Sequence, residues 1–188
     1  SIMRNKRNIS LNLREQEGQE LVRRLIPKCD FLIENFRPGT LERWGLGYED
    51  LRAINRGIIM IRVSGFGQTG PYSGRAGYGI VAEAVSGLRH ITGDPDRPPS
   101  RVAIPLTDYI GGLFGAYGAL AALTHREKTG EGQLVDTALY ESAFSVTEPF
   151  IPQYDKTGVA GMRAGPRLPG NAPNSLFLGS DGIYVQIT

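Results

Sequence analysis

Residues 58–70, IIMIRVSGFGQTG, place a run of apolar and β-branched residues directly before a glycine-rich loop. A short apolar run of this kind predicts a strand that is buried on both faces, as in a parallel sheet. Residues 30–34 predict a second such strand, and residues 8–13 alternate apolar and polar side chains with the period of a strand. Helical periodicity at 16–26 and 48–54 separates these segments. Strands that alternate with helices predict an α/β protein with a Rossmann-like parallel sheet and flanking helices.

The second half of the chain predicts further helices and then a change of composition. Helices are expected at 78–86, 108–126 and 137–155, with a short strand at 133–136. Proline and glycine in residues 161–173 indicate a linker, and Ser180-Asp181-Gly182 predicts the turn of a β-hairpin. We expect residues 1–157 to be part of a large α/β domain and residues 158–188 to hold a linker and the first hairpin of a small second domain. The sequence stops in the middle of the second expected strand of this hairpin and begins without an initiator Met, so we also expect a fragment.

The composition excludes several classes of protein. The 188 residues carry 21 Lys and Arg against 19 Asp and Glu, so no general charge favours nucleic acid or an anionic membrane. The single cysteine, Cys29, excludes an internal disulfide framework and a Cys-ligated zinc site, and we interpret it as a small buried apolar residue. The longest apolar stretch, residues 109–124, is too short to span a bilayer, and no secretory leader is visible. These features predict a soluble, cytoplasmic protein.

The glycine-rich loop contains the pattern G-x-G-x-x-G at residues 65–70. After a strand, this pattern can bind the pyrophosphate of a dinucleotide, provided that the last glycine opens a long helix. Here Pro71 and further glycines follow within ten residues, and an acidic residue about 20 positions on is missing. The context therefore favours a glycine-rich turn over a nicotinamide or flavin site.

Asp108 lies at the expected start of an apolar helix. An aspartate in this place is most often an N-cap. Thr107 could cap equally well, however, and the glycines at 111, 112, 115 and 118 weaken the helix, which indicates a flat face for close approach of another backbone or a ligand. A carboxylate near a helix N-terminus is stabilised in its ionised form, which is the form that covalent acyl transfer needs. At this point the sequence allows two roles for Asp108, a helix cap or a nucleophile.

Four arginines follow expected elements of the sheet: Arg14, Arg37, Arg43 and Arg75. Connections after parallel strands gather at the carboxyl edge of a sheet, where guanidinium groups suit phosphate. Scattered, solvated surface charge explains the same residues. The two histidines, His90 and His125, form no Ser-His-Asp or HExxH pattern, so a hydrolase or metalloprotease lacks support.

Taken together, the motifs resemble the family III CoA-transferases, a family that also contains the α-methylacyl-CoA racemases. Four stretches carry the resemblance, namely NFRPG at 35–39, WGLGY at 44–48, VSGFGQTGP at 63–71 and DYIGG at 108–112. The resemblance covers essentially the whole chain. It implies that coenzyme A or an acyl-CoA binds to the large domain as a substrate, with no permanently bound cofactor and no metal. It also implies an interlocked homodimer of the full-length protein.

The resemblance implies roles for individual residues. Asp108 matches the catalytic aspartate of the family, which would carry an aspartyl-CoA thioester. The positions that match contacts to coenzyme A are Leu11, Asn12, Leu13 and Arg14, then Asn35, Phe36 and Arg37, then Arg43, and finally Arg75, Ala76, Gly77 and Tyr78.

One departure from the family pattern bears on the reaction. Racemases of this fold use a histidine after a glycine, where this chain has Tyr78. Two-base proton transfer needs a group that holds a proton near neutral pH, and tyrosine, with an ordinary pKa of about 10, is poorly suited. We therefore expect transfer of coenzyme A from an acyl-CoA donor to a carboxylic acid. The alternatives are an acyl-CoA racemase or isomerase, and a CoA-binding fragment without activity. Residues 75–78 and 91–93 resemble members that use succinyl-CoA and dicarboxylates.

Overall fold

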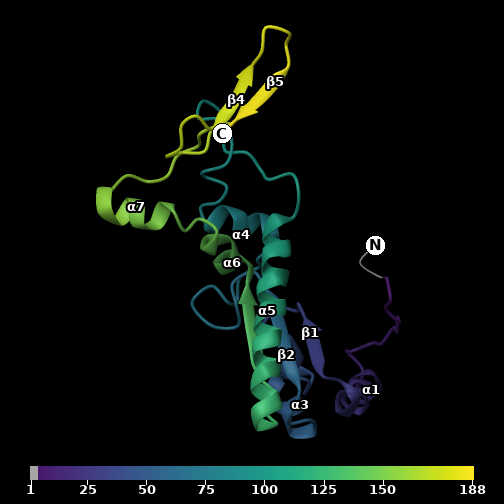
Figure 1. Ribbon diagram of the computed structural model, residues 1–188. Helices are drawn as coiled ribbons and strands as arrows, with labels where there is room; N and C mark the ends of the chain where they lie inside the picture. Colours follow the sequence, from purple (N-terminus) through teal and green to yellow (C-terminus); the bar gives the residue numbers. More distant parts are fainter. Residues whose placement is uncertain (1–3) are drawn as a thin grey trace. The chain divides into compact units, whose positions relative to one another are not determined.

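The computed structural model describes residues 4–188 (Figure 1). Its elements in chain order are α1 (Gln16–Leu25), the 3-10 helix η1 (Ile26–Lys28), β1 (Phe31–Glu34), α2 (Thr40–Arg43), α3 (Tyr48–Ile54), β2 (Ile59–Ser64), α4 (Gly79–Val85), α5 (Leu106–Thr129), β3 (Leu134–Ala138), α6 (Leu139–Ser145), α7 (Phe150–Thr157), β4 (Ser175–Leu178) and β5 (Tyr184–Ile187). They form two compact units. The first unit holds the residues up to Val63 together with Gly115–Asp136, and the second holds Ser64–Phe114 together with Thr137–Thr188.

The first unit is built around a three-stranded sheet in the order β1-β2-β3. Strands β1 and β2 are parallel, with Phe31 opposite Ile59 and Glu34 opposite Arg62. Because successive side chains of a strand point to opposite faces, Met60 joins the core cluster on one face, whereas Ile59 and Ile61 join the cluster on the other. Helices cover both faces of β2, which confirms the α/β prediction and explains why its sequence is mostly apolar.

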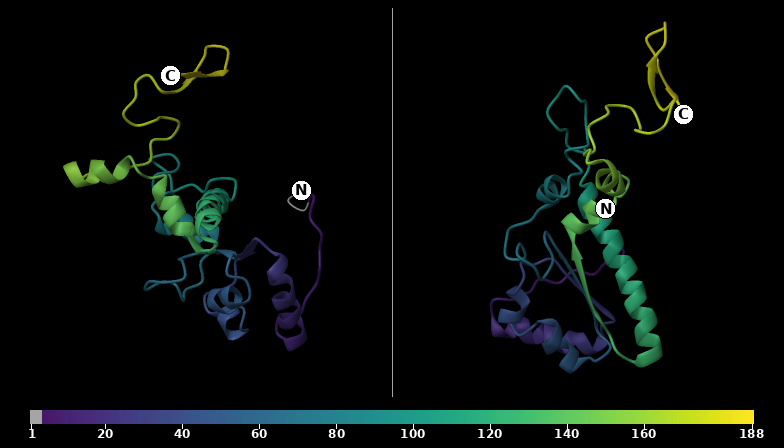
Figure 2. Two further views of the ribbon diagram at one scale, coloured as in Figure 1. Left: turned by 60° about the horizontal axis from the view of Figure 1, so that its bottom comes forward. Right: turned by 90° about the vertical axis from the view of Figure 1, so that its left-hand side faces the viewer.

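Each face of the sheet has its own helical cover. Residues of η1, α2 and α3, including Ile26, Leu41 and Leu51, form a core with Met60. On the other face, Ala122 of α5 packs against Ile59 and Ile61, and Figure 2 shows α5 running beside the strands. At Gly118 a Cβ atom would lie only 2.6 Å from Val135 Cγ1, so this glycine lets α5 approach β3 closely. The expected flat face of this helix is therefore used, at Gly118, for packing.

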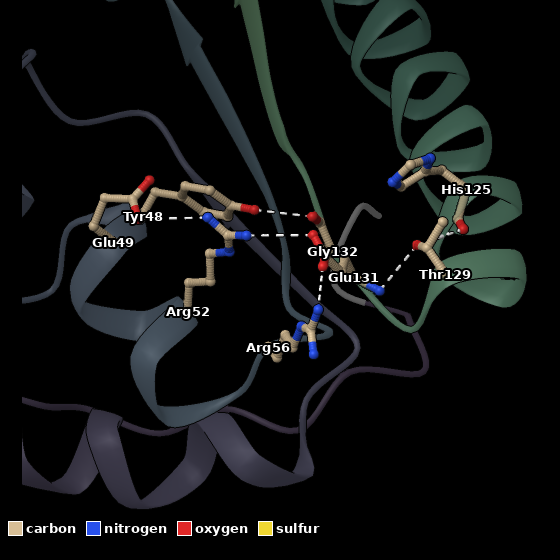
Figure 3. A network of polar contacts seen from close by, with 8 residues as sticks. All are labelled: Tyr48, Glu49, Arg52, Arg56, His125, Thr129, Glu131 and Gly132. Atoms are coloured by element: carbon tan, nitrogen blue, oxygen red, sulfur yellow. Dashed lines mark hydrogen bonds and ion pairs between the residues drawn. The ribbon is translucent and has the colours of Figure 1, made fainter.

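A polar network ties α3 to the turn that precedes β3 (Figure 3). The Tyr48 hydroxyl donates a hydrogen bond to the Gly132 carbonyl at 3.0 Å. The Glu131 carboxylate accepts hydrogen bonds from Arg52, at 3.3 Å, and from Arg56. The hydrogen bond from Arg56 holds the pKa of Glu131 below its ordinary value. The network fixes the end of α5 relative to α3 by contacts between residues almost 80 positions apart.

In the second unit, α4 and α6 lie side by side (Figure 1). The buried Glu83 of α4 accepts a hydrogen bond from the Val102 amide at 3.2 Å, which anchors the irregular segment that leads into α5. The expected hairpin is confirmed, because β4 and β5 pair antiparallel and the Asp181 side chain accepts a hydrogen bond from the Ile183 amide in the turn.

Two predicted elements are wrong. Residues 8–13 form no strand; instead the Asn12 side chain accepts a hydrogen bond from the Arg14 amide at 3.1 Å and turns the chain towards α1. The helix expected at 137–155 is divided into α6 and α7. Pro149 lies at the division, and a proline both lacks an amide donor and disfavours the helical conformation of the residue before it.

Among residues 4–188, the structure contains no helix that is long and apolar enough to cross a membrane.

Candidate active site

Asp108 is the third residue of α5. The helix begins at Leu106, and the Pro105 carbonyl accepts hydrogen bonds from the amides of Asp108 and Tyr109, both at 3.1 Å. An N-cap residue precedes the first helical residue, so the interpretation of Asp108 as an N-cap is wrong. Its side chain is exposed, whereas the adjacent Thr107 is buried. The Asp108 carboxylate is therefore not the helix cap, and it lies exposed in the first turn of a long helix.

The Asp108 carboxylate lies against the backbone of Gly79, the first residue of α4. A Cβ atom on Gly79 would lie under 3.0 Å from Asp108 Oδ2 and 2.7 Å from Thr107 Oγ1. Tyr78, directly before this glycine, is 69% exposed. The structure therefore brings Asp108 to the end of the predicted 75–78 segment. Sequence reasoning did not single out Gly79 as a functional position, although it directly follows Tyr78.

The glycine-rich loop, residues 64–77, returns on itself so that its two ends touch. A Cβ atom on Gly65 would lie under 3.0 Å from Gly77 Cα, and one on Gly77 would lie 2.6 Å from Gly65 Cα. No helix follows Gly70, because α4 begins only at Gly79. The prediction of a glycine-rich turn is thus confirmed, and the close approach of Gly65 to Gly77 gives a structural reason for glycine at both ends.

Aromatic contacts fix the interior of the same loop. Phe66 packs edge-on against Tyr72 and also contacts Tyr140 of α6, with ring centroids 5.6 Å apart in both pairs. The Tyr140 amide donates a hydrogen bond to the Gly65 carbonyl at 3.2 Å. Arg75 lies over the Tyr72 ring, with Cζ 4.2 Å from its centroid. These contacts hold Arg75 next to the segment that leads to Tyr78 and Gly79.

In the first unit, residues 35–37 follow the carboxyl end of β1. Asn35, Phe36 and Arg37 are exposed, and so is Arg43 at the end of α2. Phe36 packs edge-on against Trp44 at 5.5 Å, and Arg43 donates a hydrogen bond to the Thr40 hydroxyl at 3.1 Å. The structure thus places this predicted loop and the Arg43 end of α2 together.

The predicted coenzyme A contacts at residues 11–14 do not lie in the structural context that the sequence predicts for them. Arg14 does not follow a strand, because residues 8–13 form none; it is exposed and lies just before α1. The Leu13 carbonyl accepts a hydrogen bond from the Gln19 side chain at 3.1 Å, which holds residues 11–14 on α1. The predicted positions divide between the units. Leu11, Asn12, Leu13, Arg14, Asn35, Phe36, Arg37 and Arg43 belong to the first, and Arg75, Ala76, Gly77, Tyr78 and Asp108 to the second.

A buried ionic cluster beneath the 35–37 loop was missed by sequence reasoning. Arg62 of β2 and Glu34 of β1 have side chains that are 4% and 3% exposed, and Glu42 of α2, with a side chain that is 45% exposed, completes the cluster at the surface. Burial lowers the pKa of Arg62, but hydrogen bonds to Glu42 and Glu34 outweigh it and hold the pKa above the ordinary value. The hydrogen bond from Arg62 lowers the pKa of Glu42. The signal available in the sequence was one charged residue of opposite sign in each of two otherwise apolar strands.

Comparison with known proteins identifies the family. The model of CoA-transferase family III matches residues 1–188, and the chain therefore belongs to this family. It is 51% identical over 186 residues to the succinyl-CoA–D-citramalate CoA-transferase of Chloroflexus aurantiacus, covering 99% of this chain and 46% of that protein. It is 46% identical to the succinyl-CoA–L-malate CoA-transferase alpha subunit of the same species, covering 98% of this chain and 43% of that protein.

A solved structure agrees with this assignment. The crystal structure of a CAIB/BAIF family protein from Brucella suis matches with a TM-score of 0.88 and 40% identity, covering 95% of this chain and 47% of that one. The chain thus spans about half the length of the relatives that it matches. The resemblance found in the sequence motifs is confirmed at the level of family and fold.

Proposed function

We propose that the intact protein transfers coenzyme A from an acyl-CoA donor to a carboxylic acid, with Asp108 as the group that carries coenzyme A between them. The observation that carries this proposal is the exposed Asp108 carboxylate lying against the bare backbone of Gly79. A nucleophile in acyl transfer needs an accessible oxygen and room beside it for the thioester carbonyl. Because Gly79 has no side chain, the carboxylate fits against its backbone, and the exposure of Asp108 leaves its other side accessible.

The proposed reaction proceeds through two kinds of acyl intermediate. The Asp108 carboxylate attacks the donor thioester; the C–S bond breaks, and coenzyme A leaves as a thiolate while a mixed anhydride forms. The thiolate attacks the Asp108 carbonyl, which releases the donor acid and leaves an aspartyl-CoA thioester. The acceptor carboxylate attacks this thioester, and the same two steps in reverse yield the new acyl-CoA and free Asp108. Coenzyme A moves without hydrolysis as long as water is excluded.

Succinyl-CoA is the proposed donor and a dicarboxylic acid the proposed acceptor. Two relatives at 46% and 51% identity carry names that combine succinyl-CoA with malate or citramalate, both of which are dicarboxylates. Among the positions expected to contact coenzyme A, the exposed arginines are Arg14, Arg37, Arg43 and Arg75. Arginine forks match phosphate oxygens, so these residues suit the phosphates of coenzyme A. Two further proposals are an interlocked homodimer of the full-length protein, which the family resemblance implies, and a cytoplasmic location, which the composition indicates.

The direct test is isotope transfer by the intact protein. Succinyl-CoA is incubated with labelled malate, citramalate, mesaconate or acetate, and the CoA esters are separated and counted. We expect label in the CoA esters of the dicarboxylic acids. Deuterium incorporation at the α-carbon of an acyl-CoA, without exchange of acids, would instead identify a racemase or isomerase. Binding of coenzyme A without either reaction would identify a binding protein, and both results would contradict the proposal.

Replacing Gly79 by Ala is expected to lower the rate of CoA transfer about 100-fold, the order of loss that a small misplacement of reacting groups causes. The added methyl group would overlap the Asp108 carboxylate and turn it away from the thioester. The midpoint of thermal unfolding should fall as well, because the methyl group also overlaps Oγ1 of the buried Thr107, so the rate is compared per folded protein.

The matched control is Gly74→Ala, which adds the same methyl group where no heavy atom lies within 4 Å. Steady-state transfer rates and thermal unfolding of both variants check the prediction. Wild-type rates for the Gly79 variant would show that the carboxylate does not react in the position that the structure gives it.

A further inference from the structure

Glu34 ends β1 with a carboxylate that is almost fully buried and uses both of its oxygens. Oε1 accepts a hydrogen bond from Arg62 Nε at 2.5 Å. Oε2 accepts a hydrogen bond from the backbone amide of Phe36 at 2.6 Å. A single side chain thus connects a charged group of the neighbouring strand to the backbone of the 35–37 loop. Charge-assisted hydrogen bonds of this kind are about twice as strong as neutral ones.

Arg62 is itself held in a fixed position. It lies directly opposite Glu34 in the parallel pair of strands, and its side chain is 4% exposed. Its Nη1 and Nη2 atoms donate to the two carboxylate oxygens of Glu42 in α2, the latter at 3.3 Å. Because the guanidinium is planar and presents its donors in a rigid fork, both carboxylates are oriented relative to β2.

The loop that this cluster supports carries predicted contacts to coenzyme A. Phe36 is bound through its amide, while Asn35 and Arg37 on either side are exposed. Arg43 follows Glu42 in the chain and is also exposed. The buried cluster therefore fixes the backbone from which these exposed side chains project, on one side through Glu34 and on the other through Glu42.

We propose that Glu34 is a positioning residue for the binding of the CoA ester: it holds the Phe36 amide, and with it Asn35 and Arg37, in the geometry that contacts coenzyme A. This inference rests on the proposed function. A carboxylate of this length is required at position 34. The amide group of glutamine would turn a donor towards either Arg62 or the Phe36 amide, and aspartate, shorter by one methylene, cannot reach both partners.

The test compares Glu34→Gln and Glu34→Asp with wild type in the intact protein. We expect the Kd for coenzyme A, measured by calorimetry, and the KM for the acyl-CoA donor to rise on the order of tenfold. The KM for the acceptor acid and kcat at saturating donor should change far less. A merely structural role would lower the unfolding midpoint and the fraction of active protein but would leave Kd and donor KM unchanged. Glu34→Asp keeps the negative charge beside Arg62, so this variant provides the binding test if Glu34→Gln does not fold.

The control is Glu131→Gln, which removes another carboxylate that accepts hydrogen bonds from two arginines (Figure 3). This residue contacts no predicted coenzyme A position in the network shown, so the Kd should stay at the wild-type value. Unchanged Kd and KM in the Glu34 variants, or an equal rise in Glu131→Gln, would overturn the positioning role. A wild-type protein that binds coenzyme A but transfers nothing would contradict the proposed function alone, since the effect on Kd can still be measured.

Discussion

Asp108→Asn is expected to reduce CoA transfer at least about 10⁴-fold, a loss typical of removing a nucleophile. The amide has nearly the shape of the carboxylate, so the first turn of α5 and the contact with Gly79 should persist. What disappears is the negative charge that makes the carboxylate oxygens nucleophilic, and with it both the mixed anhydride and the aspartyl-CoA thioester. Affinity for coenzyme A should stay close to wild type, because the residues expected to contact the nucleotide are unchanged.

Two measurements check this expectation. Steady-state transfer gives the rate, and mass spectrometry of acid-quenched protein gives the adduct: the peptide that contains Asp108 should gain coenzyme A in wild type and not in the variant. Asp155→Asn, an exposed aspartate in α7, is the matched control and should keep both activity and adduct. Transfer by Asp108→Asn at the wild-type rate, or an adduct on another peptide, would contradict the role of Asp108.

The elements with strong local signals were predictable from the sequence. Helix α3 was predicted at its observed bounds. The strand predicted at residues 58–63 agrees with β2 to within one residue, because an apolar run interrupted only by Arg62 is typical of a strand buried on both faces. The prediction of a strand at residues 8–13 is wrong for a local reason. Their alternation is that of a strand, but Ile9 is 70% exposed and the hydrogen bond at Asn12 turns the chain. Apolar periodicity alone does not reveal a side chain that forms a hydrogen bond with a nearby backbone group and so turns the chain.

The parts of the candidate site that rest on a single residue or on one continuous stretch could be predicted from the sequence. Asp108 and the glycine-rich loop have signals in their own neighbourhood of the sequence. Gly79 and Glu34 do not, since their importance arises from contacts across the fold: Gly79 meets a carboxylate 29 positions later, and Glu34 meets an arginine 28 positions later. Arg62 was interpreted only as part of a strand, and its register opposite Glu34 became visible only with the pairing of β1 and β2.

Gly65→Ala is expected to destabilise the protein by about 2–4 kcal/mol, at or above the usual cost of overpacking. The added methyl group would meet the Cα atom of Gly77 at under 3.0 Å and its carbonyl carbon and oxygen at 2.8 Å. These are backbone atoms, so no change of rotamer relieves the overlap, and the two ends of the 64–77 loop must separate. The hydrogen bond from the Tyr140 amide to the Gly65 carbonyl should weaken at the same time.

The consequence for function follows from where the loop leads. Gly77 is two residues before Gly79, so separation of the loop ends displaces the backbone that lies against Asp108. Denaturant unfolding should show the loss of stability, and transfer by the protein that remains folded should also fall. Gly74→Ala, in open space within the same loop, should keep the stability and activity of wild type. If Gly65→Ala matches Gly74→Ala in both measurements, the closed loop does not hold the segment beside Asp108, and the reactive geometry must depend on other contacts.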